Sequence, residues 1–472
     1  EEEYKMTITK KAFRYLLLLI SIGIWLLVVA INSDSTYRIE ETVIIGFYFA
    51  TLIVYTLVLK QDQLEIFYPI HFVTLLYLCI FVFCPIYLIE AGSTTCNGSY
   101  IMNGAIKATF VFFVSYIALV MGYVSIKTPE FDSFSPVLDH ELSKGYKQRI
   151  IILCLGIWAL GMLINLYYLF KSGMSLSYIL TLGSQGIFEE TNAMSEVSFV
   201  SNFGYFMVIP WLYILYYSEN PVLKLFITAL TFVLYLIRGF RFIIIVIVIA
   251  IALCYYRKKR SHPSRQMFAI AVVGALLFIS IMGFMRHGLR TGSVTDWSSF
   301  SIDDILYALE TNFNIYKPFY GLVTHYPSQY AYTMGGSMIY DTITHFIPRA
   351  IWPGKPLAIY STMAIAMKNS TNAYTLDHAA MAWPNLGEYY MEFGIIGSVL
   401  IMFWFGRALK KLIRLYESTA IDDIILYAVF YGFTMQIITR GYTPTIVGLL
   451  IFLYLPAIVI RAFTLKGVRE QQ

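Results

Sequence analysis

The chain has 472 residues, of which 58% are hydrophobic, 17% aromatic and only 13% charged. Soluble globular domains carry about a quarter charged residues, so this composition excludes an ordinary soluble domain. The formal net charge of +5 says little until it is divided between the two faces of a membrane. Because the apolar runs are long enough to cross about 30 Å of hydrocarbon, we expect an all-α polytopic membrane protein.

Twelve apolar runs predict twelve membrane-spanning helices. The first run is long and lacks a small-residue cleavage pattern, so we do not expect a cleavable signal peptide. Glu1 to Lys5 precede Met6 and are expected to be a remnant foreign to the native chain, with Met6 as its start. The predicted spans are 12–32, 42–59, 67–89, 105–126, 149–170, 197–217, 222–237, 241–256, 267–284, 386–406, 423–438 and 445–462.

Lysine and arginine concentrate in the cytoplasmic loops of membrane proteins, and this rule orients the predicted spans. With the N-terminus inside, about two thirds of the 34 lysines and arginines fall on the cytoplasmic side. The outer side includes the long segment 286–385, so the bias per residue is stronger still. Both termini are therefore predicted to be cytoplasmic, and the long segment to face outside.

These boundaries divide the chain into three parts. Residues 6–285 are predicted to form transmembrane helices 1–9, residues 286–385 the long outer loop, and residues 386–472 transmembrane helices 10–12 and a cytoplasmic tail. By the same boundaries no Asp or Glu lies in mid-membrane. Ion-coupled transporters generally need such carboxylates, so this class is disfavoured.

The outer loop is predicted to contain short amphipathic helices. Ser301 to Asp304 resemble a capping box, and apolar residues recur at helical spacing from Ile302 to Tyr320. We expect that helix to lie along the membrane surface or against the bundle. A second helix is expected from about Ser337 to Phe346, and a short re-entrant helix from Tyr360 to Met367.

A proline-rich turn follows the second of these helices. Ile347 to Pro356 read Ile-Pro-Arg-Ala-Ile-Trp-Pro-Gly-Lys-Pro, with three prolines in ten residues. Proline blocks helix at its own position and disfavours it at the preceding residue, so this stretch cannot be a regular helix. A rigid turn that carries Arg349, Trp352 and Lys355 beside a membrane suggests a binding site.

Other cations also lie at the predicted outer ends of spans. Arginine suits phosphate at a lipid–water boundary, because its planar fork donates two parallel hydrogen bonds and stays charged. Several converging arginines suggest a diphosphate, whose charge on leaving they can neutralise without a metal. No cluster of carboxylates or histidines has convincing metal spacing, so we predict no metal and no cofactor. The alternative for each arginine is a side chain that snorkels from a helix end. The predicted diphosphate-binding residues are Arg238, Arg241, Arg286, Arg290, Arg349, Lys355 and Arg440.

Transfer of a sugar to a hydroxyl also needs a general base. Four of the seven histidines lie in the outer loop, and His378 is the preferred candidate because Asp377 beside it would raise its basicity and fix its tautomer. Glu388 and Asp341 are the reserve candidates. The alternative for each histidine is a structural, hydrogen-bonded role.

Two tryptophans of the outer loop are candidates for sugar stacking. Trp352 lies in the proline-rich turn and Trp383 just before the tenth predicted span. Their alternative is membership of the aromatic belt at the membrane interface.

These motifs together resemble a known family. Phe346 to Pro356 resembles the proline-tryptophan-proline signature of Wzy-type polysaccharide repeat-unit polymerases, including those of O-antigen and enterobacterial common antigen. Arg238 to Arg241 stands where these proteins carry a Gly-x-Arg turn, and Ile438 to Gly441 resembles their late arginine motif. Gly387 to Gly397 resembles their Gly-Glu and Gly-x-x-Gly segment. The resemblance covers mainly residues 230–450.

The resemblance implies a GT-C-type glycosyltransferase of the bacterial inner membrane, with its active site facing the periplasm or outside. Such enzymes move a growing glycan from its undecaprenyl-diphosphate anchor to the next undecaprenyl-diphosphate-linked repeat unit, and so build an O-antigen, capsule or similar polysaccharide. The implied partners are these donor and acceptor lipids and the bilayer, with a Wzz-type chain-length co-polymerase as a candidate and no nucleic acid.

The same resemblance assigns roles to individual residues. Arg241, Arg349 and Arg440 would grip the diphosphates, with Arg286 and Arg290 assisting. His378 would stand where the related ligase family has a functional histidine.

Two other classes stay open. An O-antigen ligase, or a GT-C enzyme with a lipid monophosphate donor, often places its acid in the first outer loop, where Asp34, Glu40 and Glu41 lie. Loss of polymer on replacing these with amides, with Arg349 dispensable, would favour that class. A flippase or exporter of lipid-linked sugars would need a continuous cationic cavity that reaches both faces, whereas these cations cluster outside.

Overall fold

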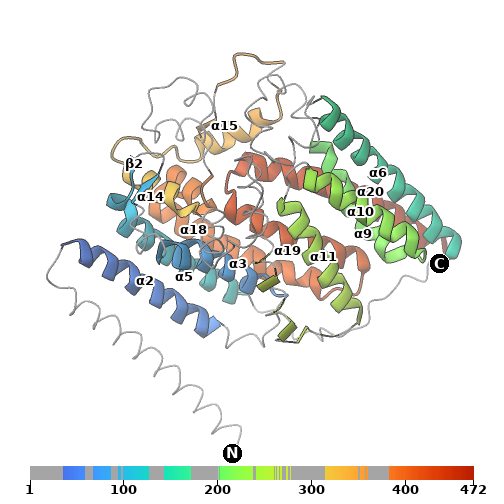
Figure 1. The fold of residues 1–472 in the computed structure, drawn as a ribbon, viewed down its shortest axis with the longest axis horizontal. Coiled ribbons are helices and arrows are strands. Elements are labelled where there is room, and N and C mark those ends of the chain that lie inside the picture. The colour runs from blue at the N-terminus through green and yellow to red at the C-terminus, as the bar shows by residue number, and fades with distance from the viewer. Residues whose placement is uncertain are drawn as a thin grey trace, which may run out of the picture. The chain divides into compact units, whose positions relative to one another are not determined.

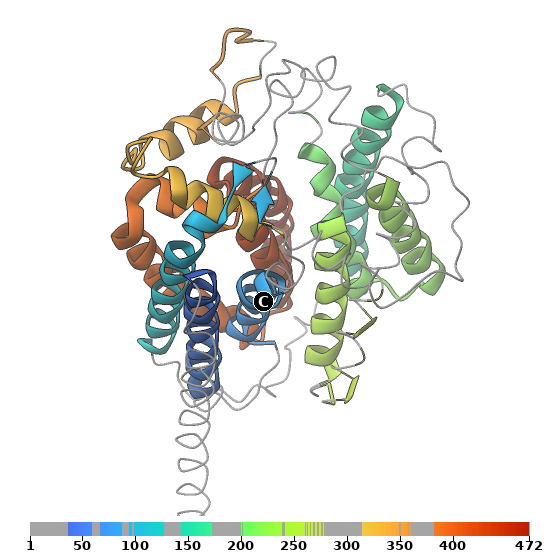
Figure 2. The same ribbon diagram turned by 60° about the vertical axis from the view of Figure 1, so that its left-hand side comes forward.

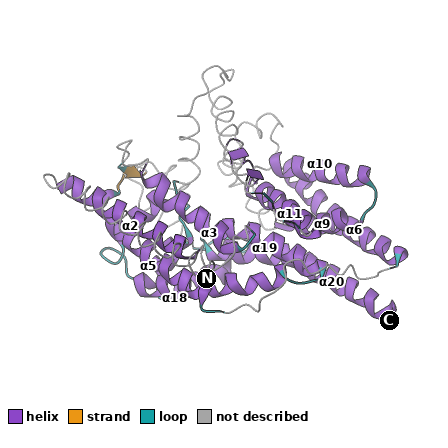
Figure 3. Cartoon of the chain, turned by 90° about the horizontal axis from the view of Figure 1, so that it is seen from below, coloured by secondary structure: helices purple, strands orange, loops and turns teal. Residues whose placement is uncertain are grey.

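The computed structural model is almost entirely helical in the part of the chain that it describes (Figure 3). Six of the described helices are long and apolar enough to cross a membrane, which confirms the all-α polytopic class. Within the described residues, one antiparallel strand pair joins β1 (Thr95–Cys96) to β2 (Ser99–Tyr100). The described residues are 36–58, 67–86, 94–96, 99–126, 143–171, 200, 202–237, 241–259, scattered positions from 261 to 277, 314–348, 351–356, 358–359 and 382–471.

The chain forms two compact units (Figure 1). The first unit comprises residues 1–127, 313–335 and 361–411, and the second comprises residues 128–312, 336–360 and 412–472. Each unit draws on both halves of the chain, so segments of the predicted outer loop belong to both.

Tyr77 lies at the centre of the first unit, where its hydroxyl donates a 2.9 Å hydrogen bond to Asn385 Oδ1. Nearby, Phe81 stacks on Phe112 with ring centroids 4.4 Å apart. Helices α2 and α5 lie side by side (Figure 2). The helices of this unit are α2 (Thr36–Val58), α3 (Pro69–Leu78) with the π-helix Cys79–Phe83, the 3-10 helix Met102–Gly104, α5 (Ala105–Val124), α14 (Tyr316–His325) and the first part of α18 (Asn385–Tyr416).

Two glycines allow the backbones of α5 and α18 to touch. A Cβ added at Gly122 would lie 1.9 Å from the carbonyl oxygen of Phe403, and one at Gly406 would lie 2.0 Å from that of Leu119. Small residues permit such close crossings between membrane helices, where packing drives association. This crossing therefore depends on the absence of side chains at both positions.

Gly122→Ala is accordingly expected to destabilise the protein by about 1–3 kcal/mol, because the added methyl group forces the two backbones apart. Thermal unfolding of the detergent-solubilised protein should show a lowered midpoint. The matched control is Gly156→Ala in another helix, where a Cβ meets nothing within 4 Å. Equal midpoints for the two variants would mean that the crossing is not tightly packed.

The second unit is built around an antiparallel pair, α11 and α19. Near the end of α11, Arg257 donates through Nε to the Tyr416 carbonyl (3.1 Å) and through Nη2 to the Ser418 carbonyl (3.3 Å), just before α19 begins. Further along, a Cβ at Gly432 would lie 2.9 Å from the Cα of Val246. The helices of this unit are α6 (Lys144–Lys171), the 3-10 helix Asn202–Met207, α9 (Val208–Tyr217), α10 (Pro221–Ile237), α11 (Arg241–Lys259), α15 (Gly336–His345), α19 (Ile421–Thr439) and α20 (Thr443–Gln471).

Most predicted helices coincide with observed ones. The loop helix expected at 337–346 is confirmed as α15. The stripe at 302–320 is described only from residue 314, and its helix α14 packs into the first unit with Tyr316, Phe319 and Leu322 fully buried. Of its two predicted positions, the described part therefore adopts the one against the bundle. Predicted span 12–32 and the segment 360–367 lie outside the described residues, as does most of span 267–284.

Candidate functional site

The structure describes some of the predicted site residues and not others. Arg241 is described for its backbone alone, as the first residue of α11. The candidates outside the described residues are Arg238, Arg286, Arg290, Arg349, Asp377 and His378. Those with described side chains are Asp341, Trp352, Lys355, Trp383, Glu388 and Arg440.

Asp341 on α15 joins two motifs that lie a hundred residues apart in the chain. Its side chain is buried, and Oδ2 accepts hydrogen bonds from the Tyr442 hydroxyl (3.1 Å) and the backbone N–H of Ile359 (3.0 Å). Tyr442 belongs to the connection between α19 and α20, two residues after Arg440. One carboxylate thus links the helix before the proline-rich turn, the chain after that turn and the connection that carries Arg440.

Lys355 holds the proline-rich turn against the end of α15. Its ammonium donates to the backbone carbonyls of Thr344 (2.6 Å) and Ile347 (3.2 Å), at the end of a helix where carbonyls lack helical partners. The backbone N–H of Ile351 donates to the Pro348 carbonyl at 3.0 Å. Lys355 therefore fixes the shape of the turn, and its contact with a diphosphate stays a prediction.

Arg440 ends α19 with a fixed backbone and an exposed side chain. Its N–H donates to the Gln436 carbonyl (3.0 Å), and its own carbonyl accepts from the N–H of Tyr442 (2.6 Å). No acceptor among the described residues pairs with its guanidinium. An arginine held in this way at the end of a membrane helix suits an anionic ligand.

The antiparallel pairing of α11 with α19 places Arg241 near Arg440. Arg257 at the end of α11 meets the start of α19, so the first residue of α11 lies at the end of the pair where α19 finishes. The backbones of two predicted diphosphate-binding arginines thus share one end of this helix pair. The proline-rich turn reaches the same end through the Asp341–Tyr442 hydrogen bond.

His345, the last residue of α15, is a further titratable group in this region. Its ring lies against α20, because Nε2 would be 3.3 Å from a Cβ at Gly448. Burial, and next the charge of Lys355, lower the pKa of His345, which keeps the imidazole neutral near pH 7. His345 is one of the four outer-loop histidines among which His378 was preferred. The signal in the sequence that could have singled out His345 is its position between a predicted helix and the proline-rich turn.

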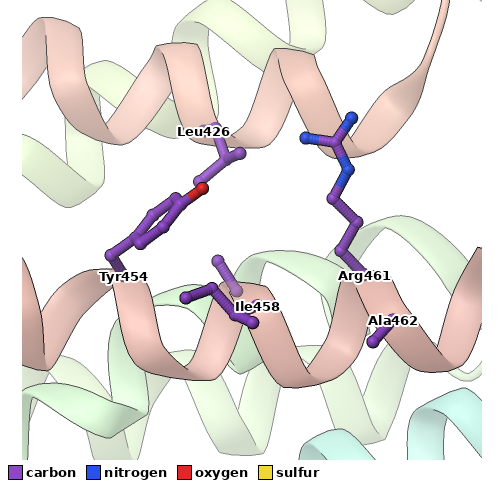
Figure 4. A pocket seen from close by; sticks show the side chains of 6 residues that line it. Leu426, Tyr454, Ile458, Arg461 and Ala462 are labelled. Atoms are coloured by element: carbon purple, nitrogen blue, oxygen red, sulfur yellow. The ribbon is translucent and has the colours of Figure 1, made fainter.

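Arg461, which is not among the predicted site residues, contrasts with Arg440. Arg461 lines an apolar pocket of about 220 Å³ between α19 and α20 and points across it from α20 (Figure 4). Its guanidinium pairs with Asp423 Oδ1 at 3.1 Å. Because Asp423 is in the first turn of α19, Arg461 lies at the opposite end of that helix from Arg440.

In the first unit, a second acidic residue anchors the Gly-x-x-Gly segment. Glu392 is fully buried, and its Oε2 accepts from the Gly335 N–H (2.9 Å) and from the Thr333 hydroxyl. Its backbone carbonyl accepts from the N–H of Met334 at 2.8 Å. Nothing in the sequence pairs Glu392 with residues 333–335, so the sequence alone does not reveal this anchor.

Gly394 adopts a backbone conformation that only glycine tolerates. Its φ is +66° and ψ −159°, which kinks α18 two residues after Glu392. A Cβ here would also lie 2.9 Å from the Tyr332 ring. The kink and the loop before α15 therefore fit each other.

We expect Gly394→Ala to cost about 1–3 kcal/mol, because such a conformation is strained for any residue with a side chain. The loss should appear in thermal unfolding and as shortened polysaccharide in cells. Gly145→Ala is the control, since a Cβ there meets nothing within 4 Å. Wild-type stability of Gly394→Ala would show that α18 straightens freely.

Three further predicted residues have described positions. Glu388 is buried in the first turn of α18, where the helix dipole favours a carboxylate. Trp383 is also buried and packs over Gly387, whose added Cβ would lie 3.1 Å from its ring. Trp352 is half-buried in the proline-rich turn. The catalytic role of Glu388 and the sugar stacking by the tryptophans stay predictions.

Metal coordination has no described candidate. Within the described ranges, no three His, Cys, Asp or Glu residues approach closely enough to hold an ion. Metal independence stays a prediction.

Comparison with known proteins identifies the family. No curated protein and no solved structure matches the chain. A family model described as O-antigen polysaccharide polymerase Wzy matches residues 11–467, nearly the whole chain. With its apolar helices and its arginine-bearing connections, the chain therefore belongs to the Wzy family of O-antigen polysaccharide polymerases.

Proposed function

We propose that this protein polymerises undecaprenyl-diphosphate-linked oligosaccharides into a surface polysaccharide, O-antigen or a similar polymer, on the outer face of the bacterial inner membrane. A bond forms between the donor sugar and an acceptor hydroxyl, and the bond from that sugar to the lipid diphosphate breaks. The hydroxyl proton goes to a base, and the diphosphate leaves with its charge neutralised by arginine. The observation that carries this proposal is the hydrogen bond from Tyr442 to Asp341, which couples two arginine-bearing connections in a Wzy-family chain.

The proposed diphosphate site consists of Arg241, Arg349 and Arg440. Support comes from the shared end of the α11–α19 pair and from the exposed guanidinium of Arg440. A diphosphate carries enough charge for more than one arginine fork. Arg286 and Arg290 are proposed to assist.

The proposed base is His378 with Asp377 as its partner, and Glu388 and Asp341 are the reserve candidates. His345 is a second histidine candidate, supported by its place beside the proline-rich turn and by its lowered pKa. A neutral imidazole can take the proton from the attacking sugar hydroxyl, whereas a charged imidazolium cannot.

The proposed topology has twelve spans, with both termini in the cytoplasm and the long loop outside. Six described helices of spanning length and the positive-inside distribution support it. A Wzz-type co-polymerase is proposed as a partner that sets chain length.

The experiment that tests this function supplies purified protein with defined lipid-linked repeat units and resolves the products by length. A ladder of integral multiples of the repeat unit, still on the lipid diphosphate, is expected. A single transfer to a different acceptor would instead indicate a ligase. Repeat units that cross the bilayer unchanged, without a ladder, would indicate a flippase.

A further inference from the structure

Helix α15 has its polar and apolar sides inverted relative to a helix on a water-facing surface. Ile339 is 63% exposed, Tyr340 44% and Ile343 65%, whereas Asp341 and Thr344 are buried. Ile339 and Ile343 are one helical turn apart and therefore lie on the same side of α15. A helix in water would bury these isoleucines and expose its carboxylate.

The proline-rich turn extends this apolar surface. Ile351 is 76% exposed, although the turn around it is fixed by Lys355 and by the Pro348 carbonyl. The polar groups on the other side of α15 are used within the protein, since Asp341 accepts from Tyr442 and from Ile359. The polar side of α15 therefore packs against the rest of the second unit, and the apolar side faces away from it.

The neighbour of α15 is a candidate membrane span. His345 on α15 touches α20 at Gly448, within the first two turns of the apolar segment Thr443–Thr464. One turn beyond Gly448, Ile451 is 40% exposed, and Leu455 and Val459 continue the same side of α20 at 41% and 50%. A span that exposes this stripe faces lipid, so α15 lies where α20 enters the bilayer.

We propose that α15 and the proline-rich turn are seated in the bilayer surface, with the side chains of Ile339, Tyr340, Ile343 and Ile351 among the lipid acyl chains. The partner is the lipid leaflet at this end of α20; only the identification of that leaflet as the outer one rests on the proposed function. Four exposed side chains cover far less than the roughly 1,200 Å² that a stable protein–protein interface buries. Amphipathic helices that lie in a membrane plane have this size and pattern.

The seating has a consequence for the site. It places the Asp341–Tyr442 junction, and Arg440 beside it, at the depth of lipid head groups. A lipid-anchored diphosphate occupies that depth, so it can reach these residues while its polyprenyl chain stays in the bilayer.

Nitroxide accessibility in nanodiscs tests the proposal without any substrate. Ile339→Cys and Ile343→Cys carry the label in a background lacking the five native cysteines. Ile458→Cys, 47% exposed on α20, is the lipid reference, and Glu219→Cys in the polar connection between α9 and α10 is the water reference. Labels at 339 and 343 should collide several-fold more with oxygen, relative to a water-soluble nickel chelate, than the label at 219.

An oxygen-to-nickel ratio at 343 equal to that at 219 would overturn the proposal. Immobilised labels that neither reagent reaches would also overturn it, because protein then covers the face. If the cysteine-free background does not fold, a photo-crosslinking phenylalanine analogue at 339 and 343 should capture phospholipid, and capture of another polypeptide segment would count against the proposal. Since no readout depends on turnover, failure here is distinguishable from failure of the polymerase assignment.

Discussion

Arg440→Ala is expected to lower the rate of polymerisation by roughly tenfold to a hundredfold, while the protein stays inserted and single repeat units accumulate. A hydrogen bond to a charged group contributes about 1.5–3 kcal/mol, and about 1.4 kcal/mol corresponds to a factor of ten. The backbone at Arg440 is fixed by Gln436 and Tyr442 and does not depend on the guanidinium, so the fold should survive the change. Repeat-unit accumulation and polymer length are read from extracted glycolipids.

The control for this prediction is Arg461→Ala at the other end of α19. It removes an equal charge and an ion pair with Asp423, yet it lies far along the helix from the proposed diphosphate site. Arg440→Lys should fall between the two, because lysine keeps the charge and loses the bidentate fork. Arg349→Ala and Arg241→Ala should behave like Arg440→Ala. Normal chain length in all three alanine variants would remove the case for an arginine site.

Asp341→Ala is expected to abolish most polymerisation. The cause is displacement of the proline-rich turn and of the connection that carries Arg440, and not the loss of the carboxylate's charge. The change removes the hydrogen bonds that the carboxylate accepts from the Ile359 N–H and the Tyr442 hydroxyl, and each hydrogen bond to a charged group contributes about 1.5–3 kcal/mol. The proline-rich turn and the connection carrying Arg440 then lose their common anchor. Polymer length in cells and thermal unfolding of the purified protein should both respond.

Graded variants separate positioning from catalysis at Asp341. Tyr442→Phe removes one of the two hydrogen bonds to the carboxylate and should cost about 1.5–3 kcal/mol, with a smaller loss of polymer than Asp341→Ala. Asp341→Asn keeps an oxygen acceptor, so it should retain substantial activity if the residue only positions the turn. Complete inactivity of Asp341→Asn in a stably folded protein would instead assign a proton-transfer role to the carboxylate.

The helices were predictable from the sequence, because membrane spans are long apolar runs. Residues 105–126 and 423–438 were expected as spans and are α5 and α19 within a few residues. Local irregularities were not predictable: the span expected at 197–217 contains the 3-10 helix Asn202–Met207, and the one at 67–89 contains the π-helix Cys79–Phe83. Hydropathy has no signal for such changes in hydrogen-bond register.

The arginines could be proposed as a site because cations are unusual on the predicted outer side. The long-range hydrogen bonds that hold the site and the Gly-x-x-Gly segment could not be predicted. Asp341 bonds Tyr442, which lies 101 residues away, and Glu392 bonds Gly335, which lies 57 residues away. Neither pairing follows from spacing, since each depends on which helices pack together. Lys355 was predicted to bind a diphosphate on the basis of its charge alone. In the structure its ammonium donates hydrogen bonds to two backbone carbonyls.

Binding of undecaprenyl diphosphate to the purified protein in nanodiscs tests directly whether Arg440 belongs to a diphosphate site. Wild type and Arg461→Ala should bind the diphosphate with equal affinity, and more tightly than undecaprenyl monophosphate. Arg440→Ala should bind the diphosphate at least roughly tenfold more weakly, as expected for one lost charge-assisted contact. Equal affinity of wild type and Arg440→Ala for the diphosphate would show that Arg440 does not bind it.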